Sequence, residues 1–141
     1  MVVIDEHSRY PVVEHLRSTS AQAVIPVLDK IFAMFGTPEV LKTDNGPPWT
    51  STQMKSFADY LGFHHRKVTP YWPCANGTAE RFMRVLGKTV KAAVVEGKSW
   101  KQELHKMLRS YRATPHTTTN HPPATLLFQR AMKTRLPDQQ N

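Results

Sequence analysis

Two acidic residues stand in surroundings that suit metal-ion chemistry. Asp44 comes directly after a predicted strand and before the turn pair Asn45 and Gly46, and Glu80 lies in the first turn of a predicted helix. The two acids are separated by 35 residues. Divalent cations prefer hard oxygen ligands, and two-ion phosphoryl transfer needs several carboxylates around ions about 4 Å apart. A strand-end aspartate, aimed by the Asn45-Gly46 turn, and a helix-start glutamate can supply part of such a site.

Basic side chains follow Glu80 at helical spacing. Arg84 and Lys88 lie four and eight residues after Glu80, so a helix places all three on one face, and Lys91 continues the same stripe. The chain has a formal net charge of +8, and the excess lies after residue 61, where there are 14 basic and 4 acidic residues. Such a face is expected to grip the phosphates of nucleic acid; the alternative is an ordinary solvated basic face.

Composition and spacing exclude several classes of protein. The single cysteine, Cys74, excludes an internal disulfide framework and a cysteine zinc cage, and His64-His65 has no metal-binding partner at usable spacing. No apolar run approaches the roughly 18 residues that span a bilayer, so no membrane partner is expected. Two acidic residues near the start argue against a signal peptide, so we expect an intracellular protein that is not secreted.

Turn, cap and periodicity signals predict strands that alternate with helices. A polar turn at 6–9 separates two strand patterns, and glycines end most of the helical patterns. Pro26 is expected to shift the start of the first helix or to kink it. The predicted strands are 2–4, 10–16, 39–43 and 63–68. The predicted helices are 21–35, a helix that ends at 61 and is capped by Thr50 or Ser51, 77–95, 100–111 and 124–130. This order indicates an α/β or α+β layer fold, with a core domain at 1–130 and a flexible tail at 131–141.

Four segments of the sequence carry a family resemblance. Lys42–Gly46, Pro70–Phe82, Tyr111–His116 and Pro123–Phe128 resemble the catalytic core of retroviral and retrotransposon integrases, in particular the gypsy-type branch of LTR retrotransposons. The likeness covers about residues 2–137. It implies an α/β fold like that of ribonuclease H, a mixed sheet flanked by helices. It also implies DNA strand transfer that depends on Mg²⁺ or Mn²⁺ held by three acids.

The resemblance assigns roles to individual residues. Asp44 takes the place of the family's second catalytic acid and Glu80 that of the third, so both are expected to be catalytic and to ligate the metal. Family members also contact DNA from the loop before the glutamate and from the helix that carries it. The expected DNA contacts of this chain are Tyr71, Asn76, Arg84, Lys88 and Lys91.

The first acid of the family pattern has no counterpart here. Family members carry it on a first, central strand, further upstream of the second acid than the 43 residues before Asp44 allow. We therefore expect this strand to be missing and the chain to be catalytically defective, either as a truncated relic or as an incomplete gene model. Asp5 is expected to cap its turn; the alternative is that it replaces the missing acid. Without the central strand, its neighbours must close up on each other or leave unpaired edges.

Two hypotheses of function follow. The first is an integrase-core-like domain that binds DNA, works in the nucleus and descends from an enzyme of DNA integration. The second is a domesticated, non-catalytic module that forms a homodimer or binds a protein partner. Salt-sensitive DNA binding that depends on Arg84 and Lys88 favours the first hypothesis, and an absence of DNA binding favours the second.

Overall fold

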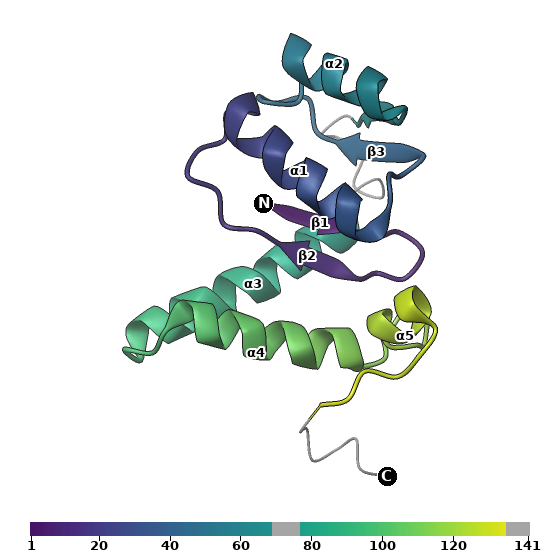
Figure 1. Cartoon of the computed structure of the whole chain (residues 1–141). Helices are drawn as coiled ribbons and strands as arrows, with labels where there is room; N and C mark the ends of the chain where they lie inside the picture. Colours follow the sequence, from purple (N-terminus) through teal and green to yellow (C-terminus); the bar gives the residue numbers. More distant parts are fainter. Residues whose placement is uncertain (69–76, 135–141) are drawn as a thin grey trace. The chain divides into compact units, whose positions relative to one another are not determined.

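The computed structural model describes residues 1–68 and 77–134, in which short strands and helices alternate (Figure 1). The elements in chain order are β1 (Val2–Ile4), β2 (Pro11–Val13), α1 (Ala21–Phe35), β3 (Val40–Thr43), α2 (Thr52–Leu61), β4 (His64–Lys67), α3 (Gly77–Val95), α4 (Trp100–Ala113) and α5 (Pro123–Phe128). Each lies within a few residues of a range expected from the sequence. Among the described residues, no helix combines the length and the apolar character needed to cross a membrane.

The chain divides into two compact units. The first unit comprises Met1 and residues Glu14–Asn76, and the second comprises Val2–Val13 and Gly77–Asn141. The N-terminal hairpin therefore belongs with the C-terminal helices, although residues 14–76 of the first unit lie between them in the sequence. The acid Asp44 belongs to the first unit, and the helix that carries Glu80 belongs to the second.

The strands form two separate pairs. The strands β1 and β2 form the expected antiparallel hairpin, in which Val3 is opposite Val12. The strands β3 and β4 pair in parallel, with Leu41 opposite His65. Each pair is a two-stranded sheet of its own in the described part of the chain. The two pairs belong to different units, so the expectation that these strands close up on each other or leave unpaired edges stays a prediction.

Helix α1 begins and ends where the sequence predicts. The side chain of Ser20 caps it by accepting a hydrogen bond from the backbone N–H of Ala23, and Gly36, with a φ of 95°, ends it. Pro26 lies inside the helix, and the helix still starts at Ala21. The expected shift of the helix start is therefore wrong, because the Ser20 cap fixes the first turn ahead of the proline.

Aromatic rings form the core of the first unit. Phe32 on α1 stacks on Phe57 of α2 with 6.3 Å between the ring centroids. Both rings meet Phe63, which precedes β4, edge-on at 5.5 and 5.6 Å. Leu28 and Met54 on the same two helices are fully buried. This packing holds α1 and α2 side by side and fixes the start of the strand that pairs with β3 (Figure 1).

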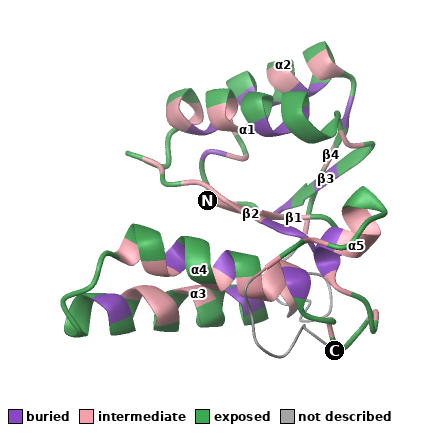
Figure 2. Cartoon of the chain, turned by 60° about the horizontal axis from the view of Figure 1, so that its bottom comes forward, coloured by how far each residue is buried: buried purple, intermediate pink, exposed green. Residues whose placement is uncertain are grey.

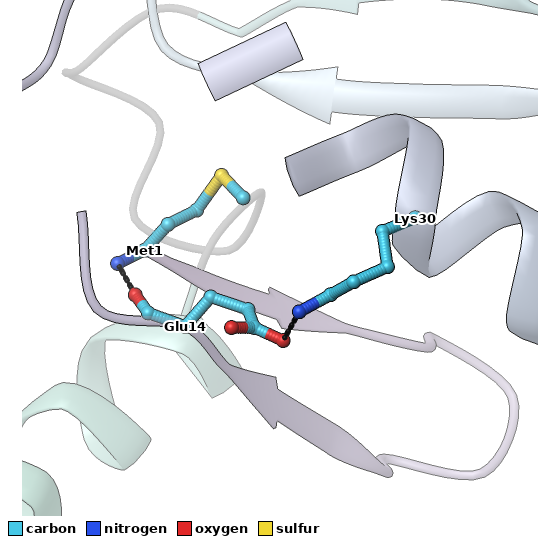
Figure 3. Close-up of polar contacts among 3 residues, drawn as sticks. All are labelled: Met1, Glu14 and Lys30. Carbon is cyan, nitrogen blue, oxygen red and sulfur yellow. Dashed lines mark hydrogen bonds and ion pairs between the residues drawn. The ribbon is translucent and has the colours of Figure 1, made fainter. Parts of the chain in front are cut away.

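Polar contacts fasten the start of the first unit to α1 (Figure 3). The ammonium group of Met1 donates to the carbonyl oxygen of Glu14 at 2.7 Å, and the N–H of Glu14 donates to the carbonyl oxygen of Met1 at 2.9 Å. The carboxylate of Glu14 forms an ion pair with Lys30 Nζ on α1 at 2.8 Å. Because the lysine is largely exposed, the pair stabilises by at most about 1 kcal/mol.

In the second unit, α3 and α4 run antiparallel and bury a shared apolar face, seen as buried bands along both helices (Figure 2). Phe82 of α3 is 1% exposed and clusters with Leu104 and Leu108 of α4. Val2 and Ile4 of β1 pack against the same cluster. The hairpin is therefore part of the core of this unit.

A single arginine joins the hairpin to α4. Arg112 donates from Nε and Nη2 to the carbonyl oxygen of Pro11, at 3.1 and 2.7 Å. Its guanidinium lies over the ring of Tyr10, 4.5 Å from the centroid, and Tyr10 meets Phe128 of α5 edge-on at 5.5 Å. Burial lowers the pKa of Arg112, and the nearby Tyr10 opposes this shift. The hairpin, α4 and α5 thus share one set of contacts.

Two helix ends differ from the sequence prediction. Helix α4 continues to Ala113, two residues past the predicted end, and its C-cap is Thr114. Helix α5 starts at Pro123 and ends at Phe128, earlier than predicted, because Gln129 adopts the left-handed conformation with a φ of 60°. Of the predicted tail, residues 135–141 lie outside the described part.

Candidate nucleic-acid interface

The carboxylate of Asp44 is exposed at the end of β3 and shapes the turn that follows it. Its Oδ1 accepts a hydrogen bond from the N–H of Gly46 at 2.9 Å. A Cβ on Gly46 would lie 3.2 Å from that same oxygen, so glycine leaves the turn room to close. Asn45 is exposed at the tip. Gly46 thus contacts the Asp44 carboxylate directly, and the role of the Asn45-Gly46 turn in placing Asp44 for chemistry stays a prediction.

A histidine that the sequence analysis did not link to Asp44 braces its backbone. The hydroxyl of Thr43 donates to the carbonyl oxygen of Asp44 at 2.9 Å, so it accepts from Nε2 of His65 at 2.7 Å. The imidazole also meets Trp49 edge-on, with 6.3 Å between the ring centroids. Burial, and then the charges of Lys67 and His64, lower the pKa of His65. The ring is therefore neutral near pH 7, with its proton on Nε2.

The basic side chains of α3 share one exposed face. At about 100° per residue, Glu80, Arg84, Lys88 and Lys91 fall within a quarter turn of the helix, and all four are exposed. Phe82 lies on the opposite side, in the core. At about 1.5 Å per residue the stripe is about 16 Å long. The predicted sharing of one face by Glu80 and the three cations is confirmed.

Asp5 has the turn-capping role that the sequence analysis assigned to it. Its Oδ2 accepts from the N–H of Ser8 at 2.9 Å and from the Ser8 hydroxyl at 2.7 Å. Ser8 is fully buried, and its Oγ accepts in turn from the N–H of Tyr10 at 3.1 Å. This carboxylate is engaged in closing the β1–β2 turn.

No preformed metal cage is present in the part of the chain that the structure describes. Within 1–68 and 77–134, no three His, Cys, Asp or Glu side chains gather so that they could hold a metal ion. Asp44 and Glu80 lie in different units, and each is an exposed carboxylate whose hard oxygen atoms suit Mg²⁺ or Mn²⁺. The predicted DNA contacts Tyr71 and Asn76, and the lone Cys74, lie outside the described residues.

Sequence comparisons identify known proteins that are similar to this chain. Residues 1–73 match the family model described as the integrase core domain. The chain is 36% identical over 137 residues to an uncharacterised protein of Caenorhabditis elegans, and 30% identical over 119 residues to the Pol polyprotein of a feline endogenous virus. These matches cover 96% and 82% of this chain but 11% of each relative. The chain thus spans about a tenth of the length of these curated relatives.

Solved structures share the fold. A chain of the simian T-cell lymphotropic virus intasome superposes with a TM-score of 0.77 at 22% identity, covering 96% of this chain and 49% of that one. The catalytic core domain of BIV integrase gives a TM-score of 0.73 at 22% identity, covering 91% and 84%. The HTLV-2 integrase catalytic core domain, solved in complex with magnesium in a trimeric form, gives 0.72 at 16% identity, covering 89% and 82%. These likenesses confirm the expected α/β, ribonuclease H-like fold. With sequence and fold in agreement, this chain belongs to the integrase core domain family.

Proposed function

We propose that this integrase core domain binds DNA through the exposed basic face of α3. The observation that carries the proposal is the stripe of Arg84, Lys88 and Lys91, held facing solvent because Phe82 anchors the opposite side of the helix. Cations spaced along about 10 Å of a rigid helix suit the phosphates of a duplex, whose strands rise about 3.4 Å per nucleotide. Membership of the integrase core domain family supports DNA as the ligand. A nuclear location is part of the proposal, since chromosomal DNA lies there.

The proposal assigns the metal-binding role to two carboxylates. Asp44 and Glu80 would hold Mg²⁺ or Mn²⁺, and the HTLV-2 integrase core solved with magnesium supports that choice of ion. A bound ion of this kind stabilises charge that develops on phosphate oxygens. In this chain Gly46 and the Thr43–His65 contact would orient Asp44, and the first turn of α3 would present Glu80.

The proposal does not include strand transfer by this chain on its own. The family pattern calls for three acids, and the sequence matches two of them. Asp5, the nearest substitute, is engaged with Ser8 in closing a turn. Removing one member of a catalytic unit generally abolishes the activity rather than trimming it. Tyr71 and Asn76 remain proposed contacts to DNA, as the family resemblance implies.

A second candidate function is a module that forms a homodimer or binds another protein. It is favoured by exposed apolar side chains near the end of α3, where Val94 is 65% exposed and Val95 is 80% exposed. A salt titration separates the two candidates, because contacts to phosphates weaken steeply with salt and apolar contacts do not. We expect the chain to remain on labelled duplex DNA at low salt and to dissociate as salt rises.

The experiment combines fluorescence anisotropy on a labelled duplex with a gel assay for DNA cutting and joining. We expect salt-dependent binding and no cut or joined product when Mg²⁺ or Mn²⁺ is added. A lack of binding at low salt contradicts the proposed ligand and favours the protein-interaction module. Metal-dependent product contradicts the proposed catalytic defect, and an Asp44→Asn variant that lacks the product would then identify the acid responsible.

A further inference from the structure

Four hydrogen-bonding side chains converge in the second unit outside the α3 stripe. Arg9 lies in the β1–β2 turn, Arg81 near the start of α3, Tyr111 near the end of α4, and His116 in the segment between α4 and α5. The Tyr111 ring meets Phe82, the neighbour of Arg81, at 5.0 Å and the His116 ring at 6.3 Å. Both arginines act electrostatically on both Tyr111 and His116. The β1–β2 turn, the start of α3 and the end of α4 with the segment after it thus bring together two guanidinium groups, a phenol and an imidazole.

Arg9 holds a hydrogen-bond donor that lacks an acceptor. Its backbone has a φ of 64°, and its N–H donates to the carbonyl oxygen of Asp5 at 2.7 Å, so the turn fixes its position. One terminal nitrogen of the guanidinium donates to the carbonyl oxygen of Glu6. In the described part of the chain, Nε of Arg9 is buried and has no hydrogen-bond partner. Because a buried unpaired donor is costly, this atom calls for an acceptor that the described residues do not supply.

The two rings also present donors. Burial raises the pKa of Tyr111, against the opposing effect of Arg81 and Arg9, so its hydroxyl keeps its proton. Burial lowers the pKa of His116, and Arg9 and Arg81 lower it further, so the imidazole is neutral near pH 7. Nδ1 of His116 accepts from the N–H of Thr118 at 3.1 Å, which leaves the proton on Nε2. All four side chains therefore carry a hydrogen-bond donor.

We propose that Arg9, Arg81, Tyr111 and His116 form a binding site for a phosphate group of a nucleic-acid backbone. Two guanidinium groups match the geometry of phosphate oxygens, and a ligand with several acceptors and no donor suits a site made of donors. The site adds to the α3 stripe, since Arg81 lies about one turn before Arg84 on the same exposed side of the helix. The choice of a nucleic acid rests on the proposed function, whereas the choice of a phosphate does not.

The first test uses inorganic phosphate as the ligand. NMR of the histidine rings in the full chain measures the pKa of His116 with and without phosphate. A bound anion favours the imidazolium form, so we expect phosphate buffer to raise this pKa relative to chloride buffer of equal ionic strength. His105, exposed on α4, is the internal control and should not respond. Equal behaviour of His116 and His105 overturns the proposal.

The variants test whether the arginines are the ligands. Arg81 is exposed, so Arg81→Gln should fold normally, and Arg109→Gln removes the same charge from an exposed position on α4 as the matched control. We expect Arg81→Gln to raise the pKa of His116 in chloride buffer, because the positive charge of Arg81, which lowers this pKa, is removed. The same change should abolish the response of the His116 pKa to phosphate. Arg9→Gln should do the same. A phosphate response that survives in both arginine variants overturns the assignment.

The second test uses duplex DNA to identify the source of the phosphate. One phosphate contact corresponds to a salt slope of about one, so Arg81→Gln should lower DNA affinity about eightfold at 0.1 M salt relative to Arg109→Gln. Equal affinities of these two variants overturn the nucleic-acid assignment and leave a site for free phosphate. If the proposed function fails instead, DNA binding is absent in the wild-type chain while His116 still responds to inorganic phosphate.

Discussion

Removing the three cations of the α3 stripe tests the proposed interface most directly. Arg84, Lys88 and Lys91 are exposed, and Phe82 on the opposite face keeps the helix in place, so the triple change to glutamine should leave the fold intact. Each cation that neutralises one phosphate contributes about 0.9 to the slope of log affinity against log salt. If each contacts one phosphate, the slope falls by about 2.7, equivalent to up to about 500-fold in affinity at 0.1 M salt.

The assay is fluorescence anisotropy on a labelled duplex, repeated over a series of salt concentrations. The matched control changes Lys101, Lys106 and Arg109 to glutamine, which removes the same charge from exposed positions on α4 of the same unit. We expect the control to lose much less affinity and to keep most of the salt slope. Equal losses in the two triple variants would refute the reasoning, since binding would then follow the net charge of the chain rather than the α3 stripe.

Three further predictions concern stability and are tested by denaturant or thermal unfolding of the full chain. Phe82→Ala should destabilise by about 3–5 kcal/mol because this ring is 1% exposed, whereas Met83→Ala, at a half-exposed position, should cost much less; equal costs would contradict the described core. Asp5→Ala should lower the free energy of unfolding by about 1–3 kcal/mol, because the buried Ser8 loses its hydrogen-bond partner. The affinity of the chain for Mn²⁺ should not change. A lower affinity for Mn²⁺ with no loss of stability would assign the Asp5 carboxylate to a metal instead. The pKa of His65 is lower in the folded chain than its ordinary value of 6.5, so the unfolded chain binds more protons at this residue. The contribution of His65 to the free energy of unfolding is therefore complete above about pH 6.5 and is lost as the pH falls through the folded-state pKa. His65→Gln should flatten this part of the pH profile, and an unchanged profile would show that His65 does not titrate differently on folding.

Local signals in the sequence were sufficient to predict most helices and strands. Ser20 and Gly36 bound α1 because a hydroxyl cap and a glycine end act within a few residues of the chain. The capping role of Asp5 is of the same kind, because its partner is three residues away. Gln129 shows the limit: its left-handed backbone ends α5 early, and glutamine carries no strong preference for that conformation.

Features that depend on distant partners could not be predicted in the same way. The link from His65 through Thr43 to the backbone of Asp44 joins residues 22 positions apart, through a parallel strand register that no local pattern specifies. The grouping of Arg9 with Arg81 and His116 depends on how the hairpin packs against α3 and α4. By contrast, the phosphate-binding role proposed for Arg84 and Lys88 could be predicted, because their spacing on one helix places both side chains on the same face.

The membership of the hairpin in the second unit has a consequence for how the chain matures during translation. Pro11 and Arg112, which share two hydrogen bonds, are 101 residues apart, so the hairpin leaves the ribosome long before the helices that cover it. The residues of the first unit emerge in between and can pack while the apolar strands Val2–Ile4 and Pro11–Val13 still wait for their partners. Such delayed closure favours slow folding and exposes a nascent strand pair to chaperones or to aggregation. A premature stop before α4 would release a chain whose hairpin has no core to join.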